Sequence, residues 1–87
     1  MMSIDFHKNF SKKLKRMSQK EQEKVKQKLT LFLENCYDPL LNNHALKGKY
    51  LDYRSINITG DLRAIYKCLT EEEIIFVDID THSNLYL

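Results

Sequence analysis

The spacing of the hydrophobic residues changes halfway along the chain, and this change constrains the fold more than any other feature. Between residues 8 and 36, apolar side chains recur every three or four positions, which is typical of amphipathic helices. From residue 53 to 80, apolar and polar side chains alternate, which is typical of strands with one buried face. A chain that passes once from helices to strands predicts an α+β fold, with helices packed on one face of a sheet.

Local signals place the expected elements. A short strand over residues 3–6 precedes two helices that form an antiparallel hairpin. Ser18-Gln19-Lys20-Glu21 has the capping-box pattern that begins the second helix, and Asp38-Pro39 ends it. A loop over residues 37–50 follows, and the expected order is β-α-α-β-β-β. The last three strands should form a mainly antiparallel sheet over residues 53–59, 62–69 and 73–80.

Length and composition limit the class of protein. The 87 residues are 43% hydrophobic and 30% charged, which predicts a single globular domain over residues 1–87. The longest clean apolar run, Ile74 to Val77, is far shorter than the roughly 20 residues of a membrane span. An acid at position 5 interrupts the place where a signal peptide would be apolar. We therefore expect a cytoplasmic protein with no membrane partner.

Charge is unevenly divided along the chain. Residues 1–28 hold nine Lys/Arg against three acids, and residues 29–87 hold five against nine. The net charge of +2 therefore combines a half of +6 with a half of −4. The total does not mark a nucleic-acid binder, whereas the basic first half leaves that function open.

Three polar clusters fall in predicted loops or at strand ends. Taken singly, each has a structural explanation. A loop histidine is usually solvated, Asp61 after Gly60 is a common turn residue, and Arg54 and Arg63 could form surface ion pairs. The clusters are residues 43–50, 54–63 and 78–86.

Together, the clusters bring two histidines and two arginines to the edges of one small sheet. His44 and His82 could divide general acid and base work, because histidine titrates near neutral pH. Arg54 and Arg63 suit a phosphate that gains charge, and Tyr86 could stack on a base. One chemistry that fits is metal-free RNA cleavage, in which a 2′-hydroxyl attacks its own phosphate.

A metal site is an alternative use of the same residues. Asp78, Asp80 and His82 share one strand face by their period of two, and His44 could complete the set. Alternating acids on an exposed strand are common, however, and the spacing matches no zinc signature.

In order along almost the whole chain, four segments resemble the YafQ branch of the RelE/ParE toxin superfamily. The combination is specific, although no single segment would be, and the expected element order agrees with a RelE-like fold. The segments are Asn43-His44-Ala45-Leu46-Lys47-Gly48, Tyr53-Arg54, Asp61-Leu62-Arg63-Ala64-Ile65-Tyr66-Lys67 and Thr81-His82-Ser83-Asn84-Leu85-Tyr86.

The resemblance implies a bacterial type II toxin that needs no cofactor and no metal. Such a toxin would be a ribosome-dependent endoribonuclease, an mRNA interferase that cleaves mRNA in the A site of the 70S ribosome and stops translation. Its partners would be the ribosome with its mRNA, and a cognate antitoxin. The antitoxin should be an acidic, partly disordered chain that folds over the toxin.

The resemblance also implies roles for particular residues. His82 would be the general acid, and His44 or Asp61 would serve as the base; which group does which stays open. Arg54 and Arg63 would stabilise the phosphorane.

Further residues would hold the RNA. The basic first helix would dock on ribosomal RNA, or would simply be a solvated helix face. The substrate-binding residues would be Tyr86, Asn57, Lys47 and Lys49, and the docking residues would be Lys12, Lys13, Lys15 and Arg16.

Two other functions stay open, and departures from the family pattern favour the second of them. Asn57 stands where YafQ has a further histidine, and Asp78 and Asp80 bring acids close to the predicted phosphate site. These acids could pair with Arg54, Arg63 or His82. A ParE-like inhibitor of DNA gyrase is one alternative, and a non-cleaving homologue that only binds an antitoxin is the other.

Overall fold

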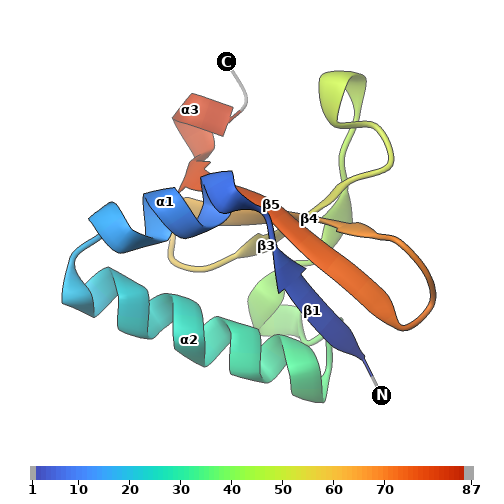
Figure 1. Cartoon of the computed structure of the whole chain (residues 1–87), viewed down its shortest axis with the longest axis horizontal. Helices are drawn as coiled ribbons and strands as arrows, with labels where there is room; N and C mark the ends of the chain where they lie inside the picture. The colour runs from blue at the N-terminus through green and yellow to red at the C-terminus, as the bar shows by residue number, and fades with distance from the viewer. Residues whose placement is uncertain (1, 86–87) are drawn as a thin grey trace.

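The computed structural model describes residues 2–85 and confirms the expected α+β architecture, with helices and a five-stranded sheet (Figure 1). Two helices and four of the strands lie where the sequence predicts them. The elements are β1 (Ser3–Phe6), α1 (Lys8–Arg16), α2 (Gln19–Glu34), η1 (Pro39–Leu41), β2 (His44–Ala45), η2 (Gly48–Tyr50), β3 (Arg54–Asn57), β4 (Leu62–Cys68), β5 (Glu73–Thr81) and α3 (His82–Leu85).

The sheet is mainly antiparallel, and its strand order is β1-β5-β4-β3-β2. β1 pairs in parallel with β5, and the remaining neighbours are antiparallel. β3 ends earlier than expected because the N–H groups of Ile58 and Thr59 both donate to the carbonyl of Leu62, at 2.9 and 3.3 Å. These bonds close the hairpin turn at residues 58 and 59, where the alternation of apolar and polar residues predicts that the strand continues.

Side-chain caps explain where the helices begin. His7 Nδ1 accepts the backbone N–H of Asn9 at 3.1 Å and caps α1. The predicted capping box of Ser18 and Glu21 is present at the start of α2. Asn35 caps the other end of that helix, next to the predicted stop.

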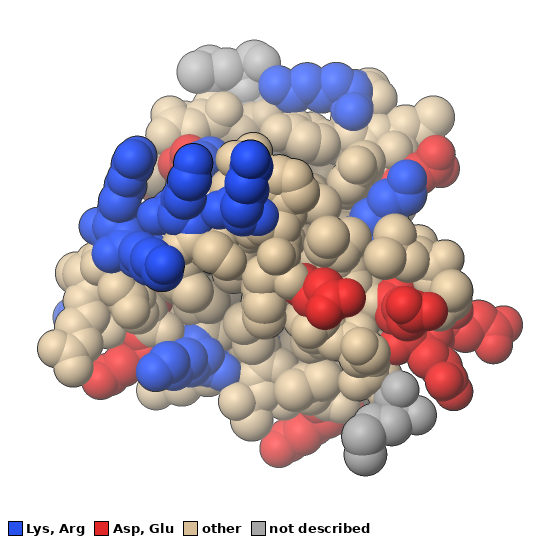
Figure 2. Space-filling view, viewed as in Figure 1, with Lys and Arg blue, Asp and Glu red and all other residues tan. Residues whose placement is uncertain are grey.

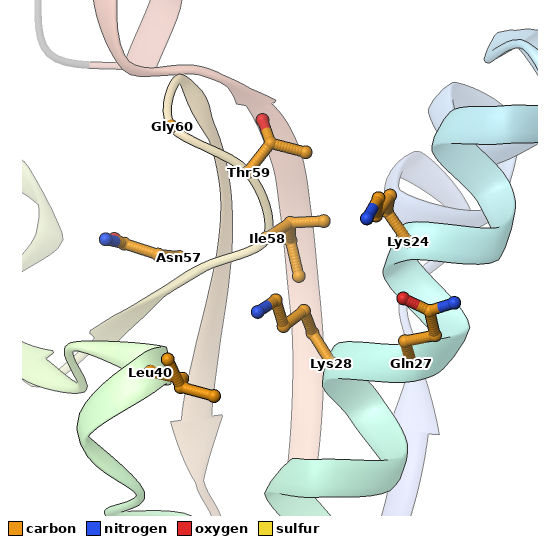
Figure 3. Close-up of a pocket in the computed structure, with 8 residues that line it drawn as sticks. All are labelled: Lys24, Gln27, Lys28, Leu40, Asn57, Ile58, Thr59 and Gly60. Carbon is orange, nitrogen blue, oxygen red and sulfur yellow. The ribbon is translucent and has the colours of Figure 1, made fainter.

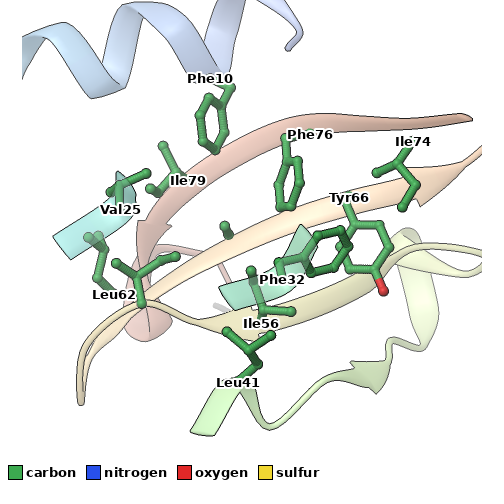
Figure 4. Close-up of a cluster of buried hydrophobic side chains, with 12 residues drawn as sticks. Phe10, Val25, Phe32, Leu41, Ile56, Leu62, Tyr66, Ile74, Phe76 and Ile79 are labelled. Carbon is green, nitrogen blue, oxygen red and sulfur yellow. The ribbon is translucent and has the colours of Figure 1, made fainter. Parts of the chain in front are cut away.

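Aromatic rings form the centre of the main core, between α1, α2 and one face of the sheet (Figure 4). The ring of Phe76 lies 5.7 Å from Phe10, 5.4 Å from Phe32 and 5.3 Å from Tyr66. All four side chains are at most 2% exposed. This packing fixes which face of the sheet the helices cover.

A second, smaller cluster lies on the other face of the sheet. Leu46, Ile65 and Leu85 are buried together there, and Val77 packs against them. Tyr66 pairs with Phe76 while Ile65 pairs with Asp78, so Val77 is the extra residue of a β-bulge. A bulge bends its strand and changes the direction of the side chains that follow it, so the end of β5 is oriented differently from its start.

The two halves of opposite charge also separate in space. Figure 2 shows lysines and arginines gathered over α1 on the left, and acids on the right beside the β4–β5 turn. None of the described helices has the length and apolar character that crossing a membrane requires.

Candidate functional site

The strand register places Asn57 and Arg63, two of the predicted functional residues, on one face of the sheet. Ser55 pairs with Ile65 and Asn57 pairs with Arg63, while the alternate residue Ile56 lies in the core beneath the helices. Because successive side chains point to opposite faces, Ser55, Asn57, Arg63 and Ile65 share the face that α2 does not cover. We call this the open face of the sheet.

The tip of the β3–β4 hairpin and the end of β5 meet at one end of the open face. The backbone N–H of His82 donates to the carbonyl of Asp61 at 2.9 Å. The guanidinium of Arg63 donates to three carbonyls of the same turn, those of Thr59 at 2.9 Å, Gly60 at 3.0 Å and Leu62 at 3.2 Å. Asp61, Arg63 and His82 are therefore held together, as the sequence predicts.

His44 lies on β2, at the edge of the sheet, and is exposed. Its Nδ1 is 2.8 Å from the carbonyl of Asn42. A carbonyl can only accept, so Nδ1 carries the proton and Nε2 of the neutral ring has a free lone pair. This tautomer suits a base.

Three strand spacings, about 14 Å, separate the strand of His44 from the strand that leads to His82. The two rings therefore do not form one hydrogen-bonded pair. Their segments do converge, because Leu46 and Leu85 both pack on Ile65. The sequence indicates neither this cluster nor the helix α3 that carries Leu85, since contacts between residues so far apart leave no local pattern.

Arg54 is the exception among the predicted catalytic residues. It pairs with the core residue Tyr66, so it lies on the helix-covered face. Its Nε donates to Asn43 Oδ1 at 2.8 Å, and its guanidinium carbon lies 5.6 Å from the centre of the Tyr37 ring. The prediction that Arg54 joins Arg63 at the phosphate is not supported, because the register sends the two side chains to opposite faces.

Arg54 instead helps to hold the strand of His44. Asn43 accepts from Arg54 and also donates through Nδ2 to Cys36 O at 2.8 Å and to Tyr66 Oη at 2.7 Å. This network ties the residue before His44 to the end of α2 and to β4. Burial raises the pKa of the Tyr66 hydroxyl despite the bond from Asn43 and the nearby charge of Arg54, so the phenol stays protonated.

Asn57 and Ser55 each place one buried polar atom without a partner in the described part of the chain on the open face. Ser55 is fully buried, and neither its Oγ nor Asn57 Oδ1 has a hydrogen-bond partner among residues 2–85. Unpaired buried polar atoms are costly and are usually satisfied by water or a ligand. Asn57 is a predicted substrate contact, whereas Ser55 has no distinguishing sequence signal.

The acids on β5 are paired with the basic first helix. Lys13 Nζ lies 2.8 Å from Asp78 Oδ1 and 3.0 Å from Asp80 Oδ2. Partial burial opposes the charge of Asp80, but hydrogen bonds from Asn84, the Thr81 backbone and Lys13 outweigh it and lower the Asp80 pKa. The acids therefore pair with Lys13 and not with Arg54 or Arg63, and this shared cation, which offsets one of their two charges, is one of the predicted docking residues.

The other predicted RNA contacts occupy exposed positions. Lys12, Lys15 and Arg16 are exposed on α1, and Lys47 and Lys49 are exposed around η2. Tyr86, the predicted base-stacking residue, lies outside the described residues.

A hollow of about 380 Å³ lies between α2 and the β3–β4 hairpin, on the side away from the open face. Figure 3 shows Lys24 and Lys28 directed toward it from α2, whereas the side chain of Asn57 points away from both. The hollow therefore lies behind the hairpin turn whose carbonyls hold Arg63, and Asn57 is part of its lining.

Within residues 2–85, no three His, Cys, Asp or Glu side chains are grouped so that they could hold a metal ion. Lys13 occupies Asp78 and Asp80, the first two members of the metal set considered from the sequence. His44 lies three strands from β5.

Comparisons with known proteins identify the family of this chain. The family model described as the bacterial toxin of the type II toxin-antitoxin system, YafQ, matches residues 2–87. Among solved structures, YafQ from Escherichia coli BL21(DE3) is 25% identical with a TM-score of 0.82, and the alignment covers 100% of both chains. No curated protein sequence gave a significant match.

Two further structures extend the similarity. The toxin in the E. coli DinJ-YafQ toxin-antitoxin complex is 27% identical, with a TM-score of 0.79 over 99% of this chain and 98% of that one. A metal-bound toxin from Helicobacter pylori is 29% identical, with a TM-score of 0.71 over 99% of this chain and 100% of that one.

The fold and the match over nearly the whole chain define a small toxin of the RelE superfamily. Within it, the chain belongs to the YafQ family of type II toxin-antitoxin toxins.

Proposed function

We propose that this toxin is an endoribonuclease that cleaves mRNA in the ribosomal A site without a metal ion. The observation that carries the proposal is the backbone bond from the His82 N–H to the Asp61 carbonyl, which brings two residues with titratable side chains next to each other at the end of the open face. Arg63 lies beside them, and two of its N–H groups are not used by the turn carbonyls. A titratable pair next to a guanidinium is the set that phosphodiester cleavage requires.

In the proposed mechanism, the RNA lies across the open face. His44 or Asp61 takes the proton of the 2′-hydroxyl, which attacks the adjacent phosphorus, and His82 gives a proton to the 5′-oxygen that leaves. The products are a 2′,3′-cyclic phosphate and a free 5′-hydroxyl. Arg63 stabilises the charge on the phosphorane, Asn57 contacts the substrate, and Arg54 acts only by positioning β2.

His44 would be the base if the RNA spans the sheet, because its Nδ1 is taken by the Asn42 carbonyl and its Nε2 is left to face the substrate. Asp61 is nearer to His82 and would serve if the scissile phosphate sits at the hairpin tip. Lys47 and Lys49 would contact RNA phosphates from the η2 loop.

The proposed partners are the 70S ribosome and a cognate antitoxin. The antitoxin is proposed because the similar E. coli toxin is found in a complex with DinJ. Cytoplasmic location follows from a ribosomal target and is part of the same proposal.

Cleavage of translated messages tests the function directly. Purified toxin added to a reconstituted translation reaction should produce new mRNA 5′ ends within the reading frame, and none on the same RNA without ribosomes. A parallel assay should show unchanged supercoiling by DNA gyrase. Altered supercoiling without cuts would favour a ParE-like inhibitor, and no effect in either assay would favour a homologue that only binds its antitoxin.

The ion pairs of Lys13 give it a structural role, whereas the other lysines of the basic helix α1 are free to dock on ribosomal RNA. Lys12→Met and Lys15→Met should weaken ribosome binding and lower its salt dependence by about one unit of slope each, because each removes one phosphate contact. Lys13→Met should leave binding nearly unchanged and cost up to about 1 kcal/mol of stability, because it leaves Asp78 and Asp80 unpaired. Ribosome pelleting over a salt series and urea denaturation measure the two effects. Equal losses of binding for all three variants would show that Lys13 also docks.

A further inference from the structure

A second hollow, of about 320 Å³, lies on the open face between the start of α1 and the η2 loop. Its lining includes Tyr50, Tyr53 and Lys49 on one side, His7 and Asn9 on the other, and Val77 at β5. We call it the tyrosine pocket. Its volume is at the lower end of the range for small-ligand sites.

The pocket adjoins the proposed site of cleavage. Tyr50, Tyr53 and Val77 pack against the cluster of Leu46, Ile65 and Leu85. That cluster joins the segments that carry His44 and His82. A strand of RNA that reaches the catalytic residues along the open face would therefore pass the tyrosine pocket.

Aromatic rings and cations lie together at the pocket: Tyr50, Tyr53 and Lys49 line it, and Lys67 lies beside Tyr53, outside the lining. The rings of Tyr50 and Tyr53 meet edge to face, with their centres 6.2 Å apart. Lys49 Nζ lies 5.2 Å from the centre of the Tyr50 ring, and Lys67 Nζ lies 5.4 Å from the centre of the Tyr53 ring. Residues 29–87 contain only five lysines and arginines, so two of the five accompany these two rings.

This combination matches the chemistry of single-stranded RNA. Bases stack on aromatic side chains, and lysines contact the phosphates on either side. His7 Nδ1 accepts the Asn9 N–H, so Nε2 of its neutral ring is a donor, and the Asp78 carboxylate in the lining is an acceptor. The pocket thus has a stacking surface, cations, and polar groups for the edge of a base.

We propose that the tyrosine pocket binds one nucleobase of the mRNA near the cleaved phosphate, and that Lys49 and Lys67 contact the flanking phosphates. The inference rests on the proposed nuclease function and adds to it a subsite for the substrate. The pocket would contribute to the choice of sequence at which the message is cut.

Equilibrium binding tests the pocket separately from catalysis. The probe is a fluorescent single-stranded RNA with 2′-O-methyl groups throughout, which cannot be cut by 2′-hydroxyl attack. Tyr53→Ala should weaken its binding about 5- to 150-fold, as expected for one stacked base. Tyr53→Phe should bind like the wild type, and Lys67→Met should lower the salt slope by about 0.7. Tyr37→Ala, which alters a tyrosine that is 65% exposed outside the pocket, is the matched control and should have no effect.

An abasic scan of the same RNA gives the decisive comparison. At one position, loss of the base should weaken binding by the wild type as much as Tyr53→Ala does. The same abasic RNA should cost Tyr53→Ala nothing further. Three results would overturn the proposal. The first is that the losses from the abasic site and from Tyr53→Ala add at every position of the RNA. The others are unchanged binding by folded Tyr53→Ala and Lys67→Met, and no measurable binding by the wild type. A loss confined to antitoxin binding would also overturn it, because it would make the pocket a protein-binding surface.

The ribosomal cleavage assay distinguishes the two failures. If the wild type cuts mRNA but the abasic losses are additive, the pocket proposal fails and the nuclease stands. If the abasic RNA costs Tyr53→Ala no further binding but the wild type cuts no mRNA, the pocket binds RNA and the proposed nuclease function fails.

Discussion

Replacing His82 with alanine should lower the rate of mRNA cleavage about 10²- to 10⁴-fold, the contribution of a general acid. The substitution should leave the site assembled, because the bond from residue 82 to Asp61 comes from the backbone N–H. Alanine also favours the helical conformation that α3 begins at this position. Single-turnover cleavage on ribosomes that carry a defined message measures the effect.

Ser83→Ala is the matched control, because it changes the next exposed residue of the same helix. It should cleave at the wild-type rate. Near-wild-type cleavage by His82→Ala would refute the assignment of the general acid.

The dependence of the rate on pH adds a second readout for the same variant. A general acid must be protonated, so His82→Ala should lose the fall in rate at high pH. The variant that lacks the base, either His44→Ala or Asp61→Asn, should lose the fall in rate at low pH. This comparison decides which of the two residues is the base.

Phe32→Ala should cost about 3–5 kcal/mol of unfolding free energy. Phe32 is fully buried, and its ring contacts Tyr66 at 5.0 Å and Phe76 at 5.4 Å between centres. A domain of this size has roughly 4–13 kcal/mol of total stability, so the loss would remove a large part of it. Urea denaturation of the toxin alone measures the change.

Leu33→Ala is the control for this substitution. Leu33 is the next residue of α2 and is 55% exposed, so its replacement should change stability by less than about 0.5 kcal/mol. Similar costs for the two variants would contradict the packing of α2 on the sheet.

The fold could largely be predicted because its signals are local. The capping box of Ser18 and Glu21 places the start of α2, and alternation places β4 and β5. β2 was missed because a strand of two residues has no periodicity to detect. α3 was missed because it has only four residues, and Leu85 is buried by contacts with distant residues.

The candidate site was predictable only in part. Asp61, Arg63 and His82 follow from the resemblance, and the structure brings them together. The face on which Arg54 lies depends on strand register, since a shift of one residue reverses every side chain. The orphaned hydroxyl of Ser55 and the tyrosine pocket arise from residues that carry no motif.

The change of period along the chain determined by itself that helices precede a sheet, because the spacing of apolar residues sets which face each element buries. The sequence also determined that the positive charge lies in the first helices. Only the tertiary structure decided what that charge does, because Lys13 and Asp80 are 67 residues apart along the chain and meet through the packing of α1 against β5. The acids beside the proposed active site thereby pair with a lysine of the basic half, which offsets one of their two negative charges, and only a folded chain can bring such distant charges into contact.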